Sequence, residues 1–121
     1  MLGSPLYMAP EIVQEKEYNH KVDIWSVGVI CYILLCGVAP FNARNKDEIY
    51  KSILTKTDLY DLPIWSKVSN DCLLFVKRCL ERDPKKRAEA HELLEHSWMK
   101  TKVIYKEVED DVKLDVNNNL N

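Results

Sequence analysis

The feature that most constrains this chain is an apolar stretch over residues 22–38, whose side chains leave no polar face. A helix that is hydrophobic all round must be enclosed by protein or by lipid. A membrane-spanning helix needs about 20 apolar residues, and Asp23 together with the stop at Gly37 and Pro40 leaves a shorter run. The stretch therefore predicts a central buried helix surrounded by amphipathic helices, and no membrane span.

Size, charge and cysteine content exclude several classes of protein. The chain has 121 residues, of which 46% are hydrophobic and 30% charged, as in one small globular domain. A net charge of −2 gives no basic footprint for nucleic acid, and the N-terminus lacks a secretory signal pattern. Cys31, Cys36, Cys72 and Cys79 form no CxxC pair. They predict free thiols in a reducing, cytoplasmic compartment and no metal site.

The ends of the first two predicted helices are marked by glycine, proline and asparagine. Residues 3–11 hold two prolines and a glycine, which predicts an ordered loop, and Pro10 suits the first position of a short helix. Asn19 is a candidate cap for the central helix. Gly37 closes that helix, and Pro40 prevents its continuation.

Three further helices are predicted, at residues 45–54, 70–82 and 88–95. Asn45 and Glu48 have the spacing of a capping box, and Ser69 is a candidate cap for the second of these helices. The third is expected to bury Leu93 and Leu94. No strand-like alternation persists anywhere, so the predicted fold class is all-α.

Four motifs then occur in a fixed order: MAPE at 8–11, DIWSVGV at 23–29, GVAPF at 37–41, and RDPKKR at 82–87 followed by LEHSW at 94–98. Together they resemble the lower half of the large lobe of a eukaryotic serine/threonine protein kinase. The segments at 28–37 and 60–65 are similar to those of calcium/calmodulin-regulated kinases, especially calcium-dependent kinases that carry a calmodulin-like domain. Four motifs in order count against an unrelated helical protein with a chance APE.

The resemblance covers residues 1–99 and leaves residues 100–121 as a charged, Asn-rich tail or linker. Within the tail, Ile104, Val108 and Val112 recur every fourth residue, which is compatible with one amphipathic helix. In the resembled kinases an autoinhibitory segment begins near this point. The asparagine tract favours a disordered linker instead.

The resemblance implies two structural roles. Glu11 would pair with Arg87 and tie the end of the activation segment to the last helices, the alternative being two surface charges that never meet. Asp23 would anchor the catalytic loop by accepting hydrogen bonds from its backbone.

The resemblance also implies a substrate-binding set: Met1, Ser4, Pro5 and Met8. Ser4 stands where the family has a Thr or Ser that contacts the catalytic Asp and Lys. Met1, Pro5 and Met8 would line the pocket for the substrate residue after the phosphoacceptor, and the alternative for these three is plain packing.

Two positions depart from the family pattern. Glu89 stands where many relatives place a capping Ser or Thr, which predicts a final helix looser by about 1 kcal/mol. Ile33 stands where basic-directed relatives have a Glu that binds a substrate arginine. This departure counts against a strongly basic substrate consensus.

Phosphoryl transfer by kinases needs a Gly-rich loop, a strand-borne Lys, the Asp of HRD and the Asp of DFG. None of these motifs occurs in the 121 residues, and neither does an EF-hand pattern. ATP and Mg²⁺ are therefore implied for a complete kinase, while this chain alone is expected to bind no cofactor, to hold no catalytic residue and to be inactive.

Two functions remain open from the sequence. The chain is either part of a kinase that transfers the ATP γ-phosphate to Ser or Thr of protein substrates, or a free, non-catalytic helical module that binds proteins. In both cases the central helix lacks the catalytic loop and the helix that would cover it. An exposed apolar patch of this kind predicts self-association or a need for the remainder of the kinase domain.

Overall fold

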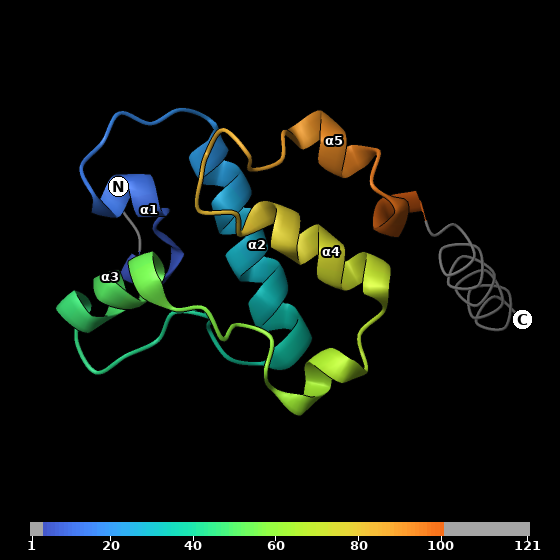
Figure 1. Ribbon diagram of the computed structural model, residues 1–121, viewed down its shortest axis with the longest axis horizontal. Coiled ribbons are helices and arrows are strands. Elements are labelled where there is room, and N and C mark those ends of the chain that lie inside the picture. The colour runs from blue at the N-terminus through green and yellow to red at the C-terminus, as the bar shows by residue number, and fades with distance from the viewer. Residues whose placement is uncertain (1–3, 101–121) are drawn as a thin grey trace, which may run out of the picture.

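The computed structural model describes residues 4–100, and every regular element in that range is helical (Figure 1). The helices are α1 (Pro10–Val13), α2 (Lys21–Cys36), α3 (Lys46–Thr55), α4 (Asn70–Cys79) and α5 (Ala90–Leu94), with 3₁₀ turns η1 (Pro5–Tyr7), η2 (Pro63–Ser66) and η3 (Ser97–Lys100). The predicted all-α fold class is thus confirmed. None of the described helices is both long and apolar enough to cross a membrane.

Helix α2 runs through the middle of the structure, with α1 and α3 on one side and α4 and α5 on the other (Figure 1). At its start, the Asn19 side chain accepts a hydrogen bond from the Lys21 N–H at 2.9 Å. At its end, Gly37 has φ 82°, a left-handed conformation that glycine adopts without steric cost. Its N–H donates to the carbonyl of Ile33 at 2.7 Å, so the predicted stop is confirmed.

The larger of two hydrophobic clusters joins α2 to α3, to the connector after α3 and to Val76 and Leu80 at the end of α4, and it contains several aromatic rings. Trp25 stacks on Phe41 with ring centroids 5.4 Å apart, so the ring that follows Pro40 does return to the core. Tyr32 lies 4.9 Å from Trp65 of η2 and donates a hydrogen bond to the carbonyl of Leu59. The long connector after α3 is therefore held by its buried aromatic and leucine side chains.

On its other side α2 packs directly against α4, and Gly28 makes this approach possible. A Cβ atom at Gly28 would lie 2.6 Å from the Cβ of Cys79 and 2.8 Å from the Cδ2 of Leu80, closer than any real side chain is found. The second cluster forms here, from Ile24, Phe75, Cys79, Ala88 and Leu93.

Two predicted helix boundaries were wrong. Helix α4 ends at Cys79, because Arg82 turns away to donate hydrogen bonds to the carbonyls of Ile53, at 2.8 Å, and Lys56. Helix α5 begins only at Ala90, because Glu89 has extended backbone with ψ 158°.

The prediction that Leu94 is buried was also wrong. Helix α5 has only five residues, and successive side chains on a helix point about 100° apart. Leu93 faces the core, so Leu94 faces outward and is 67% exposed.

One face of α2 is uncovered among the described residues, although its sequence is apolar all round. Asp23, Val27, Ile30 and Leu34 share this face and are all exposed, Leu34 by 80%. Three of the four are large apolar residues, which soluble proteins seldom leave together at the surface. The helix is therefore packed on two sides and open on a third.

Candidate functional site

Arg87 and Glu11 lie together as a buried ion pair, although 76 positions separate them in the chain. The guanidinium donates two parallel hydrogen bonds, from Nη1 to Oε2 at 2.7 Å and from Nη2 to Oε1 at 2.8 Å. Arg87 is 1% and Glu11 4% exposed. The pair fastens α1 to the segment between α4 and α5.

The remaining donors of Arg87 are also satisfied. They donate to the carbonyls of Glu81 at 2.8 Å, Lys21 at 3.0 Å and Arg82 at 3.3 Å. The guanidinium also lies 5.2 Å from the centre of the Trp25 ring. A guanidinium has five N–H donors, so its charge is buried without an unpaired donor.

The pKa of Glu11 reflects two opposing effects. Burial raises the pKa of this carboxyl, whereas the hydrogen bonds and the positive charge of Arg87 lower it. The second effect prevails, and the pKa lies below its ordinary value. Glu11 is therefore a carboxylate at neutral pH and is stabilised as one by its partner.

The segment before α1 forms a short shelf at the surface. The Ser4 hydroxyl is exposed and accepts a hydrogen bond from the Leu6 N–H at 3.3 Å, which caps η1. Pro5 and Met8 are half-buried, and Met8 packs against the larger core cluster. Met1 lies outside the described residues. The structure thus places three of the four expected substrate-binding residues along one stretch that leads directly into α1.

Asp23 lies in the first turn of α2 with its side chain exposed. Within residues 4–100, its carboxylate makes no hydrogen bond or ion pair. It shares the uncovered face of α2 with Val27, Ile30 and Leu34.

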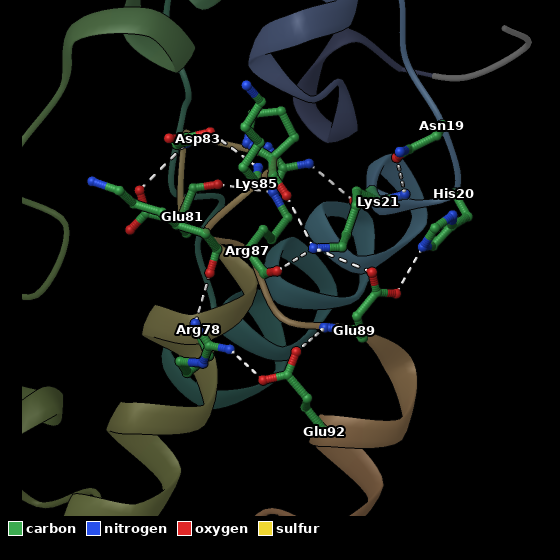
Figure 2. Close-up of polar contacts among 12 residues, drawn as sticks. Asn19, His20, Lys21, Arg78, Glu81, Asp83, Lys85, Arg87, Glu89 and Glu92 are labelled. Atoms are coloured by element: carbon green, nitrogen blue, oxygen red, sulfur yellow. Dashed lines mark hydrogen bonds and ion pairs between the residues drawn. The ribbon is translucent and has the colours of Figure 1, made fainter.

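A second set of charged residues, which the sequence did not indicate, surrounds the start of α2 (Figure 2). The Glu89 carboxylate lies 2.7 Å from Nε2 of His20 and 3.6 Å from Nζ of Lys21. Lys21 is buried, at 6% exposure. A Lys at the first position of an apolar helix was the available signal, because a cation rarely becomes buried without a partner.

The expected loosening of the final helix stays a prediction, and the structure shows what supports the start of that helix. The Glu92 side chain accepts a hydrogen bond from the Glu89 N–H at 3.1 Å, as the third helical residue does in a capping box. Glu92 also accepts from Nη2 of Arg78 at 2.7 Å. Helix α5 therefore starts with a supported N-terminus, and the side chain of Glu89 reaches across to α2.

In the part of the chain that the structure describes, no group of three or more His, Cys, Asp or Glu side chains is arranged to hold a metal ion. The site consists of a shelf, residues 4–8, followed by α1 and by a buried ion pair that anchors both.

Comparison with known proteins agrees with this fold. Residues 1–99 match the model of the protein kinase domain family. A CDPK-related protein kinase of Daucus carota is 45% identical over 100 residues, which cover 83% of this chain and 16% of that protein. Calcium-dependent protein kinase 10 of Oryza sativa subsp. japonica is 47% identical over 100 residues, or 82% and 16% of the two chains.

Calcium/calmodulin-dependent protein kinase type 1B of Homo sapiens is 41% identical over 97 residues, which cover 80% of this chain and 28% of that protein. The chain belongs to the protein kinase domain family. It corresponds to part of such a domain and resembles the calcium-dependent kinases. It spans only between 16% and 28% of the length of the relatives named here.

The Glu11–Arg87 pair predicts a strongly non-additive mutant cycle. Glu11→Gln or Arg87→Met alone strands one buried group and should cost about 3–5 kcal/mol of unfolding free energy. The double variant should cost clearly less than the sum, because neither charge is then left unpaired. Urea denaturation followed by circular dichroism measures each value. Glu95→Gln is the control, because its partner Lys100 and Glu95 itself are largely exposed, and such pairs contribute about 0–1 kcal/mol.

The same pair predicts acid sensitivity. Because the folded-state pKa of Glu11 is lowered, its contribution is complete above the unfolded pKa of about 4.3 and is lost as pH falls through the folded value. Thermal midpoints should fall more steeply towards acid pH for the wild type than for Glu11→Gln. Parallel curves for these two proteins would contradict the assignment. Glu95→Gln should follow the wild type.

Proposed function

We propose that this chain forms the substrate platform and C-lobe scaffold of a serine/threonine protein kinase. The complete enzyme would transfer the γ-phosphate of ATP to Ser or Thr of protein substrates. The observation that carries this proposal is the buried, two-pronged Glu11–Arg87 ion pair, which holds the shelf at residues 4–8 against the helical core. Family membership and relatives named as calcium-dependent and calcium/calmodulin-dependent kinases support it.

In this proposal the shelf orients the substrate. The exposed hydroxyl of Ser4 is available to groups of the catalytic loop, and Met1, Pro5 and Met8 contact the substrate residue after the phosphoacceptor. Kinase catalysis depends mostly on positioning and electrostatic stabilisation. The contribution of this chain is then to fix the acceptor segment, and the rigidity of the Glu11–Arg87 pair supports that role.

Asp23 is proposed as the anchor of the catalytic loop. Its exposed carboxylate and the apolar residues beside it, Val27, Ile30 and Leu34, form a surface suited to another part of the same kinase domain. Backbone N–H groups of that part would donate to Asp23, and apolar side chains would cover the rest of the face.

ATP and Mg²⁺ belong to the complete domain in this proposal. The residues present do not fit them, because the sequence has no Gly-rich loop and no HRD or DFG motif, and the described part holds no metal-binding cluster. The chain alone is proposed to be inactive. Residues 1–99 are assigned to the kinase domain and residues 100–121 to a tail or linker, and the free cysteines suit a cytoplasmic location.

The size and activity of the endogenous polypeptide test the proposal. An antibody against residues 60–68 should detect a band well above 14.1 kDa. That band, after immunoprecipitation, should phosphorylate Ser/Thr substrates, whereas the recombinant 121-residue chain should not. A band of about 14.1 kDa alone, without kinase activity, would instead identify a free protein-binding module.

The uncovered face of α2 predicts that the isolated chain self-associates. Replacing Ile30 and Leu34 by Ser should shift it towards monomer, because both side chains are exposed and apolar on that face. Size-exclusion chromatography with light scattering measures the change. Leu94→Ser is the control, since Leu94 is equally apolar and exposed but lies on α5. A monodisperse wild-type monomer with a sharp melt would count against this prediction.

A further inference from the structure

The ammonium group of Lys21 lies in a closely fitted polar environment (Figure 2). Its Nζ donates to the carbonyl of Pro84 at 3.0 Å and to the carbonyl of Arg87, and lies 3.6 Å from Oε1 of Glu89. Lys21 is buried. Two backbone carbonyls thus accept hydrogen bonds from the ammonium group, and one carboxylate lies within ion-pair distance of it. This buried cation therefore has protein partners in place of water.

Lys21 and Arg87 are joined to each other by two hydrogen bonds in opposite directions. Lys21 Nζ donates to the carbonyl of Arg87, and Arg87 Nη1 donates to the carbonyl of Lys21 at 3.0 Å. Each buried cation thus donates to the backbone carbonyl of the other residue. A buried cation is stabilised only when a counter-charge is close, so Lys21 and Arg87 each require a carboxylate.

Each buried cation has its own carboxylate partner. Glu11 binds Arg87 with both of its oxygens. In the described part of the chain, Glu89 supplies the one carboxylate within ion-pair distance of Lys21. His20 holds the other Glu89 oxygen at 2.7 Å, which directs the carboxylate towards α2.

We infer that Glu89 is a positioning residue for the substrate platform, acting through Lys21 on the Arg87–Glu11 pair. This inference rests on the proposed function only in calling residues 4–8 and α1 a platform. Glu89 balances the charge of Lys21, Lys21 holds the backbone of residue 87, and Arg87 then reaches Glu11 of α1. The start of α5 and the shelf before α1 are coupled by this relay of contacts.

Chemical labelling of the full chain tests the relay without ATP or substrate. Acylation of lysine amines and dicarbonyl modification of arginine, both read by peptide mass spectrometry, report the accessibility of Lys21 and Arg87 in monomers and oligomers alike. Glu89→Gln should raise the labelling rates of both residues several-fold. Glu95→Gln makes the same charge change just after α5, against the exposed Lys100, and should leave both rates unchanged.

A double variant distinguishes the loss of charge balance at Lys21 from a general loosening of the structure. Lys21→Gln combined with Glu89→Gln removes the buried cation along with its counter-charge and keeps a hydrogen-bond donor. Labelling of Arg87 should return most of the way to the wild-type rate. Persistent labelling in the double variant would overturn a role through the charge of Lys21.

Cys79 serves as the internal measure of folding, because it is fully buried. If Glu89→Gln exposes Cys79 to alkylation, His20→Ala is the milder variant, since it removes only the support of the carboxylate. It should raise labelling of Lys21 and Arg87 by a smaller factor while Cys79 stays protected. Unchanged labelling of Arg87 when Lys21 becomes accessible would overturn the inference. A failure of the kinase proposal would appear instead in the activity assay, with these rates unaffected.

Discussion

The arrangement of this chain depends on one buried guanidinium. Arg87 lies between α1, the start of α2 and the segment that follows α4, and donates to groups from all three. A buried charge is tolerated only when its donors are satisfied and a counter-charge is close. Because the acceptors come from distant parts of the sequence, satisfying Arg87 requires that these parts assemble together. The ion pair therefore acts more on which structure forms than on how stable it is.

The apolar side chains pack differently on the two sides of α2. Aromatic rings fill the wide space towards α3 and the connector, with Trp25 on Phe41 and Tyr32 against Trp65. On the α4 side Gly28 allows backbone and small side chains to meet directly. Large aromatic rings therefore cover the irregular connector after α3, whereas the close contact at Gly28 determines how α2 packs against α4. The platform is thus mounted on a scaffold that is rigid where helices cross.

The ends of several helices could be predicted from the sequence, because they depend on residues close together in the chain. The Gly37 end of α2 and the cap at Ser69 followed from side-chain and backbone preferences alone. The N-cap of α2 is His20, one residue after the predicted Asn19, whose side chain still accepts a hydrogen bond from the Lys21 N–H. The pairing of Glu11 with Arg87 was accessible only through motif resemblance, because nothing in a spacing of 76 residues indicates contact. The position of Lys21 in an apolar helix indicated that it would need a partner, but the sequence could not identify its partners, since they depend on which carbonyls a tertiary turn directs towards the buried amine.

The Gly28 contact has a consequence for movement between the two halves of the structure. A helix that slides along its neighbour by one turn moves by about 5.4 Å. Such a shift of α2 would bring Ile24 or Tyr32 opposite Cys79, where not even a Cβ atom fits at position 28. The missing side chain at Gly28 therefore fixes the position of α2 along α4, because a shift by one turn would place a side chain where none fits.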